Sequence, residues 1–124
     1  MRSNSLPDSA VSDSAVVAKA AVRAADRLGL TNKVLALIIG VSEASISRLR
    51  QGTFPLEKKP FELAVLFVRL YRSLDATVGG DENVARAWLK NKNTALKAAP
   101  IDLIQSVSGL ANVLSYLDSR RALV

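Results

Sequence analysis

Residues 34–52 have the sequence VLALIIGVSEASISRLRQG, which changes character at Gly40. The part before this glycine is apolar, whereas the part after it is polar and carries two arginines. Gly40 should end the first helix, and Ser42 can cap a second helix that runs to about Arg50. The stretch therefore predicts two helices joined by a tight turn. It leaves open whether they form a plain helical hairpin or a helix-turn-helix that binds DNA.

The spacing of small and apolar residues distinguishes these alternatives. In a helix-turn-helix the two helices cross steeply and closely, so small and apolar residues are needed at fixed positions. Counted from Asn32, the chain fills these positions, and the side chains left outside are short hydroxyls and long cations suited to phosphates and base edges. This register resembles the helix-turn-helix of the Xre and phage-repressor group. The packing residues are Leu35, Ala36, Ile39, Gly40, Val41, Ile46 and Leu49.

The resemblance implies a DNA-contacting surface on the second helix. In such repressors the N-terminal half of this helix enters the major groove, so Glu43, Ala44 and Arg48 are expected to face bases. An arginine can bind guanine through two hydrogen bonds. Glu43 has a second interpretation, because a carboxylate in the first turn also stabilises the helix dipole. The predicted DNA-contact residues are Ser42, Glu43, Ala44, Ser45, Ser47, Arg48, Arg50, Gln51 and Thr53, of which Ser42, Arg50, Gln51 and Thr53 are expected over phosphates.

The composition narrows the fold and the chemistry. Of the 124 residues, 49% are hydrophobic but only 5% are aromatic, and Ala, Leu and Val dominate, which favours an all-α fold. A formal charge of +6 suits a polyanionic partner. Because Cys and His are both absent, we expect no enzyme, no cofactor and no metal site. The chain has no membrane-length apolar run and no signal-peptide pattern, which predicts a cytoplasmic protein that does not bind membranes.

Turn residues divide the chain into three predicted segments. Residues 1–13 are rich in Ser and Asp and are expected to form a flexible N-terminal arm. Residues 14–78 should form the helix-turn-helix domain. The pair of glycines at 79 and 80 marks the boundary to a second domain at residues 79–124.

Further helices flank the helix-turn-helix. We expect a first helix from Ser14 to about Leu28 and a fourth helix from Pro60 with an apolar stripe at three- and four-residue steps. In the second domain, Asp81 should cap a helix. Pro100 should begin a short helix, which Gly109 interrupts before a last amphipathic helix.

The run from Ala87 to Leu117 resembles the toxin-binding domain of the Xre/MbcA/ParS family of antitoxins. The resemblance lies in the spacing of its residues rather than in any single one, and each residue also has a plain structural interpretation as core, cap or turn. Family members often have a glycine between the Leu and the Pro, where this chain has Lys97, Ala98 and Ala99, and a glycine-containing tail where this chain has RRALV. The matching residues are Trp88, Leu89, Asn93, Leu96, Pro100, Leu103, Gly109, Val113 and Leu117.

The resemblance implies an antitoxin of a type II toxin-antitoxin system. Such a protein would occlude the active site of a cognate RES-domain toxin that consumes NAD, repress its own operon by binding operator DNA, and form a homodimer within a heteromeric complex. The alternative is a stand-alone dimeric Xre-like repressor, whose C-terminal helices serve only for dimerisation. The inhibitory contact is expected either on the tail from Tyr116, where an arginine can occupy an oxyanion site, or on the surface from Trp88 to Pro100. The predicted toxin-binding residues are Trp88, Asn93, Pro100, Tyr116, Arg120 and Arg121.

Overall fold

The computed structural model describes the backbone of residues 5–122 and the side chains of residues 13–121. The regular elements of this part are helices, apart from one isolated bridge between Asn93 and Ala98, so the all-α prediction is confirmed. None of the helices described is both long enough and apolar enough to cross a membrane. The helices are α1 (Ser5–Arg27), α2 (Asn32–Ile39), α3 (Glu43–Gln51), α4 (Lys58–Thr77), α5 (Glu82–Lys90), α6 (Pro100–Leu103) and α7 (Val107–Ala122).

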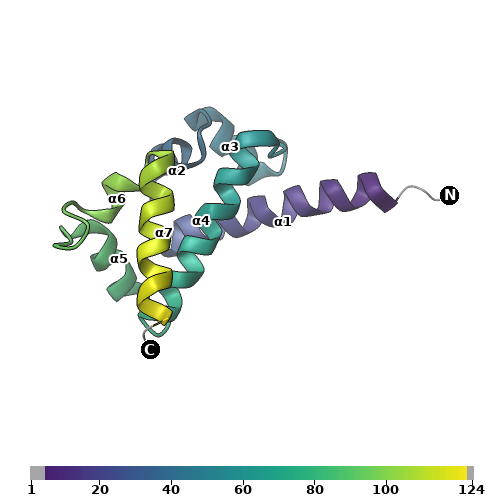
Figure 1. Cartoon of the computed structure of the whole chain (residues 1–124). Helices are drawn as coiled ribbons and strands as arrows, with labels where there is room; N and C mark the ends of the chain where they lie inside the picture. Colours follow the sequence, from purple (N-terminus) through teal and green to yellow (C-terminus); the bar gives the residue numbers. More distant parts are fainter. Residues whose placement is uncertain (1–4, 123–124) are drawn as a thin grey trace.

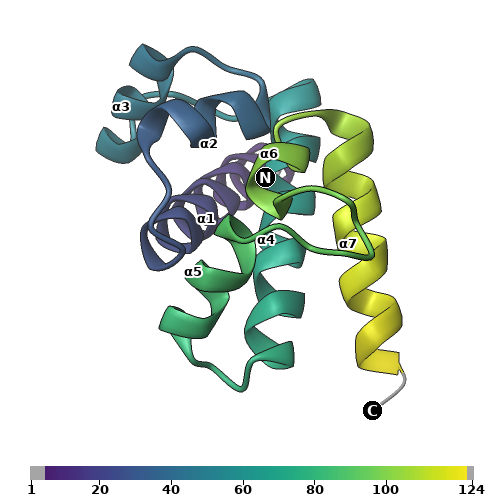
Figure 2. The same cartoon turned by 90° about the vertical axis from the view of Figure 1, so that its left-hand side faces the viewer.

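Two long helices, α4 and α7, lie side by side and run in the same direction (Figures 1 and 2). Helix α1 crosses behind them, and its N-terminal end extends away from the rest of the molecule. The α2–α3 pair lies at one end of α4, while α5 and α6 flank the other side of α7. Consequently, α3 and the C-terminal end of α7 lie at opposite ends of the molecule.

A single hydrophobic core holds the helices together. Helix α4 is central to it, because Phe67, Leu70 and Leu74 are fully buried and α4 packs on α1, α2 and α7. The apolar stripe predicted from Pro60 onward thus faces the core, as an amphipathic helix requires. The glycines at 79 and 80 do end α4, with φ angles of 62° and 81°. They do not separate two independent cores, since α4 of the first predicted domain packs against α7 of the second.

Short-range capping interactions set the helix boundaries where the sequence predicts them. The Thr31 hydroxyl accepts a hydrogen bond from the Val34 amide at 3.1 Å, and the Asp81 carboxylate accepts from two amides of the first turn of α5. Gly40 ends α2 in the left-handed conformation, with φ 76°, which a side chain would strain. Pro100 occupies the first turn of α6.

Two predicted boundaries are wrong. The first helix is predicted to begin at Ser14, but α1 begins at Ser5, so residues 5–13 of the predicted arm are helical; residues 1–4 lie outside the described part. Gly109 does not interrupt a helix, because it lies in the first turn of α7 and the break falls at residues 104–106. A Cβ at Gly109 would overlap the Leu103 carbonyl oxygen and lie 2.7 Å from the carbonyl carbon. Glycine is therefore needed here for the close approach of α6 to α7.

Candidate DNA-binding and partner-binding surfaces

Helix α3 is fixed at both ends and along its inner face. The Ser42 hydroxyl caps it by accepting a hydrogen bond from the Ser45 amide at 3.1 Å. Gly52 ends it in the left-handed conformation, with φ 78°. Ile46 and Leu49 are buried against the core and thus hold the helix in place. The exposed residues of α3 and its flanks are Ser42, Glu43, Ala44, Ser47, Arg48, Arg50, Gln51 and Thr53.

The Arg48 side chain is held in position on the outer face of α3. Its Nη2 donates a hydrogen bond to the Ser45 hydroxyl at 3.1 Å, and its guanidinium lies 5.7 Å from the centre of the Phe54 ring. A cation above an aromatic ring is an attractive arrangement. The residue is nevertheless exposed, so its remaining donors can reach a ligand. A side chain ordered in this way loses less entropy when it binds a base.

The prediction of a DNA contact at Ser45 is wrong. The residue is only 6% exposed, and its hydroxyl bonds to the Ser42 hydroxyl at 2.8 Å and to Arg48. The physical reason is that Ser45 lies one helical turn before Leu49 and therefore shares the inner face of α3. Ser45 orients Arg48 and does not itself face solvent.

Ser42 and Thr53, two other predicted phosphate contacts, cap the ends of α3. The amide and the hydroxyl of Thr53 both donate to the Arg48 carbonyl, at 2.9 and 3.2 Å, and so satisfy the C-terminal end of α3. Ser42 is the N-cap. Both residues are exposed, so these bonds leave them accessible to a phosphate.

Arg50 is engaged differently from the phosphate contact that we expected. Its Nη1 and Nη2 donate to the two carboxylate oxygens of Asp26 at 3.2 and 2.9 Å, and its Nε donates to the Asn32 side chain at 2.8 Å. These hydrogen bonds lower the pKa of Asp26 and raise the pKa of Arg50. Arg50 therefore clamps α3 to the ends of α1 and α2, and three of its donors are occupied.

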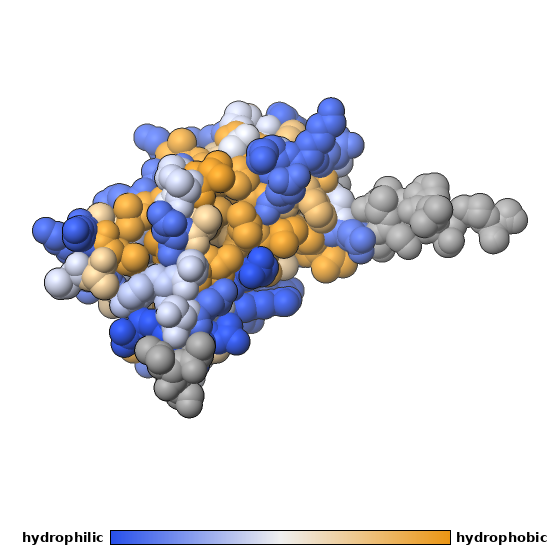
Figure 3. Space-filling model, in the orientation of Figure 1, coloured by the Kyte–Doolittle hydropathy of each residue, from blue (hydrophilic) through white to orange (hydrophobic). Residues whose placement is uncertain are grey.

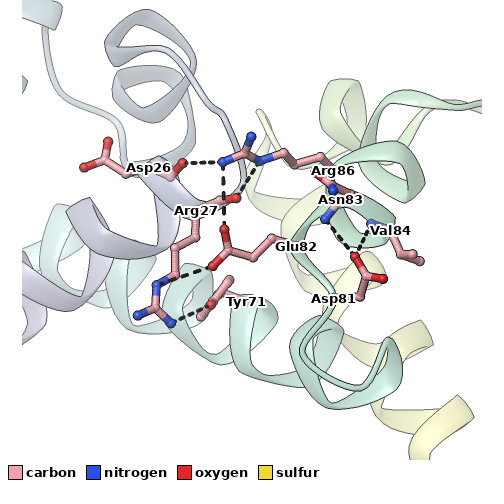
Figure 4. Close-up of polar contacts among 8 residues, drawn as sticks. All are labelled: Asp26, Arg27, Tyr71, Asp81, Glu82, Asn83, Val84 and Arg86. Atoms are coloured by element: carbon pink, nitrogen blue, oxygen red, sulfur yellow. Dashed lines mark hydrogen bonds and ion pairs between the residues drawn. The ribbon is translucent and has the colours of Figure 1, made fainter.

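Next to this clamp, side chains of α5 bind the C-terminal end of α1 (Figure 4). Arg86 donates to the carbonyl oxygens of Arg27 and Asp26 at 2.7 and 3.3 Å, which satisfies backbone groups that the helix end leaves free. Glu82 pairs with Arg27 at 3.8 Å and with Arg86 at 4.0 Å. Arg27 also donates to the Tyr71 hydroxyl at 3.3 Å, and this contact raises the pKa of Arg27.

The sequence interpretation missed this network. The one local signal is the four-residue spacing of Glu82 and Arg86, which predicts an ion pair on a helix surface. The carbonyl oxygens that Arg86 binds lie 59 and 60 residues earlier in the chain. Because such partners are brought together by the tertiary fold, no periodicity in the sequence indicates them.

Three of the predicted toxin-contact residues form one column. The rings of Trp88 on α5 and Tyr116 on α7 are stacked, with centroids 6.4 Å apart. The Arg120 guanidinium lies 5.7 Å from the centre of the Tyr116 ring, one turn further along α7. The two rings are half-buried and Arg120 is exposed. The column therefore presents flat apolar surface with a cation at its end.

The other three predicted toxin-contact residues lie elsewhere. Asn93 organises the loop before α6, since its side-chain oxygen accepts from the Leu96 amide at 3.0 Å and its backbone bonds to Lys97 and Ala98. Pro100 is buried at the start of α6, so its predicted contact with a partner is wrong, because its ring packs inward. Arg121 lies on a different side of α7 from Arg120, where it donates to the Ser73 hydroxyl of α4 at 3.3 Å.

Two family models match the chain. The antitoxin Xre-like helix-turn-helix domain matches residues 9–69, which contain α2 and α3. The antitoxin Xre/MbcA/ParS C-terminal toxin-binding domain matches residues 73–122, which contain the Trp88 column. No curated protein matches the chain. Both matched families are binding domains rather than enzymes.

Proposed function

The chain belongs to the Xre/MbcA/ParS antitoxins, with an Xre-like helix-turn-helix domain and a toxin-binding domain, and from this we propose that it represses its own operon and blocks a RES-domain toxin that consumes NAD. Its partners are operator DNA and a cognate toxin. We propose that it acts in the cytoplasm as a homodimer within a larger complex, because two-fold symmetric helix-turn-helix proteins read paired half-sites. We assign it no cofactor.

The observation that carries the DNA-binding part is the position of Arg48. It lies on the exposed face of a helix whose opposite face is anchored by Ile46 and Leu49, and it is ordered by Ser45 and Phe54. Glu43 and Ala44 lie exposed in the first turn of the same helix, next to where a major groove would run. Ser42, Ser47, Gln51 and Thr53 supply short polar groups around them for phosphates.

The test is the binding of the purified protein to its own promoter and to scrambled duplex DNA. Arg48→Ala should reduce the preference for the promoter by about 1–3 kcal/mol, because a bidentate contact to guanine is lost. Arg23→Ala, on the exposed side of α1, serves as the control. Equal affinity of the wild-type protein for both duplexes would contradict the repressor part of the proposal.

The toxin-binding part is supported by the exposed end of α7. Tyr116 and Arg120 form one continuous surface with Trp88, and Arg120 carries a guanidinium suited to an oxyanion-binding pocket. An NAD-consuming toxin must hold a pyrophosphate, so a guanidinium at the entrance of its active site would compete with the substrate. We propose that the end of α7 makes this inhibitory contact, with the Trp88 surface beside it.

Removal of the residues after Asp118 tests this contact. The truncated chain should still bind the promoter but fail to protect cells that express the toxin. Arg120→Ala is the finer variant, and Arg23→Ala on the exposed side of α1 is its control. If the truncated chain neutralises the toxin as well as the full chain does, the contact lies instead around Trp88 and Asn93.

A stand-alone dimeric repressor is the second candidate function. It shares the α3 surface but needs no other protein. Coexpression with the product of the adjoining reading frame, followed by copurification, separates the two candidates. Recovery of this chain as a homodimer alone would favour the stand-alone repressor.

A further inference from the structure

A basic cleft lies between α4 and α7, away from the α3 surface and beside the end of α7. Arg69 and Arg72 of α4 and Arg121 of α7 line it together with Asp118, around a volume of about 520 Å³. Arg121 and Asp118 are 3.8 Å apart, and the Ser73 hydroxyl donates to Asp118 at 2.8 Å. Among the side chains that the structure describes, no carboxylate pairs with Arg69 or Arg72. The cleft thus holds three guanidinium groups against a single carboxylate.

The basic cleft continues into an apolar surface along the same two helices. Val65 lies one turn before Arg69 on α4, and Val107 and Ala111 lie on the α7 face that leads to Asp118. Val107 is 56% exposed, so its side chain is accessible to a partner. Figure 3 shows apolar residues over α4, next to a column of mostly intermediate hydropathy along α7, with hydrophilic residues below.

We infer that this α4–α7 face binds an acidic segment of the partner protein, with carboxylates in the cleft of Arg69, Arg72 and Arg121 and apolar side chains on Val65 and Val107. Arginine forks match carboxylates in geometry, and protein interfaces combine an apolar centre with such charge pairs. The inference rests on the proposed function, since it takes the toxin as the partner.

The same features argue against the other occupants. A DNA backbone would leave the apolar half of the face uncovered. Arg121, which lines the cleft, belongs to the C-terminal end of α7, and this end lies opposite α3 in the molecule. A second copy of this chain carries 17 Lys and Arg residues against 11 Asp and Glu residues, so its net charge of +6 would be repelled by the basic cleft. The face also adjoins the end of α7, so a partner seated here would reach the Arg120 region as well.

The experiment measures binding of the full chain to the purified product of the adjoining reading frame, over a series of salt concentrations. Arg69→Glu/Arg72→Glu should weaken binding at least about tenfold and reduce its salt dependence, because attractive charge pairs become repulsive. Lys19→Glu/Arg23→Glu, an equal charge change on the exposed side of α1, should stay within about twofold of wild type. Circular dichroism verifies that each variant is folded.

A second pair of variants tests the apolar half of the face. Val107→Asp should weaken binding, whereas Val16→Asp, at a site that is 65% exposed on α1, should not. If the wild-type chain binds the neighbouring protein and the Arg69→Glu/Arg72→Glu variant binds equally well, the inference is wrong while the antitoxin proposal stands. If the wild-type chain does not bind the neighbouring protein, both the inference and the antitoxin proposal are wrong. If the variant loses promoter binding but keeps the partner, DNA is the occupant and the inference is overturned.

Discussion

Replacing Asp26 with alanine decides what Arg50 does for DNA binding. If Arg50 clamps α3 to α1 and α2, Asp26→Ala and Arg50→Ala should both weaken operator binding. If Arg50 instead contacts a phosphate, Asp26→Ala frees its guanidinium and removes a nearby negative charge, so binding should tighten. The two roles therefore predict opposite signs for the same substitution.

The expected size follows from the clamp itself. Arg50 makes three hydrogen bonds of 2.8–3.2 Å, but its side chain is 30% exposed and that of Asp26 is 57% exposed. Solvent screens such a pair, so we expect each variant to lose about 1 kcal/mol of unfolding free energy. If the clamp stabilises the DNA-binding orientation of α3 by this full amount, its removal lowers operator affinity about fivefold. Ile46 and Leu49 keep the helix in place and prevent a larger loss.

The assay is fluorescence anisotropy with labelled operator DNA over a range of salt concentrations. Both variants should keep the wild-type salt slope, whereas loss of one phosphate contact would lower it by about 0.9. The double variant should lose little more than either single variant, because the residues act as one unit. Arg23→Ala, which removes an exposed cation of α1, is the control. Tighter binding by Asp26→Ala would refute the clamp.

Three further predictions concern stability. Gly109→Ala should cost about 3 kcal/mol of unfolding free energy in urea titrations, because its Cβ would overlap the Leu103 carbonyl and force α6 away from α7. Lys97→Gly should stabilise the chain by about 0.5–1 kcal/mol, since Lys97 has φ 65°, a conformation that glycine adopts without strain. The pKa of Asp26 lies below its ordinary value of 3.8, so the Arg50 clamp stabilises the fold above that pH and is lost as the pH falls through the lowered pKa. The difference in unfolding free energy between wild type and Arg50→Ala should therefore narrow below pH 3.8.

Matched variants keep these stability predictions specific. Gly80→Ala, at φ 81° with no atom within 4 Å of the added Cβ, should cost only about 1 kcal/mol. Equal losses at Gly109 and Gly80 would contradict the steric argument. Lys92→Gly in the same loop should not stabilise the chain, and a gain there equal to that of Lys97→Gly would point to a cause other than the backbone angle. A difference for Arg50→Ala that stays constant down to pH 2 would contradict the assignment of the clamp to Asp26.

Local patterns were sufficient to predict the helix-turn-helix and most helix boundaries. Thr31, Ser42 and Asp81 cap the helices that follow them, and such bonds join residues only two or three positions apart. The same kind of pattern also indicated the inner face of α3, apart from Ser45. The polar character of serine suggests exposure there, but its position one turn before Leu49 indicates burial.

The contacts between distant segments could not be predicted in this way. The bond from Arg50 to Asp26 spans 24 residues, and the bond between Ser73 and Asp118 spans 45. Each bond depends on how α1, α4 and α7 pack together. The apolar stripes in the sequence indicate which face of each helix is buried, but they do not indicate which helix covers that face. The departure at Lys97 was visible in the sequence as a missing glycine. Its meaning, a strained backbone angle, required the structure.

The match to the helix-turn-helix domain ends at residue 69, and the match to the toxin-binding domain begins at residue 73. The junction between the two matched domains therefore falls inside α4. A helix that is buried on both sides of such a junction cannot melt in one half alone, because its Phe67 and Leu74 belong to the same core. A protease that cuts within α4 would therefore destroy both matched domains in a single event. Under the proposed function, repression and neutralisation would then end together, and the lifetime of this one helix would set the lifetime of both.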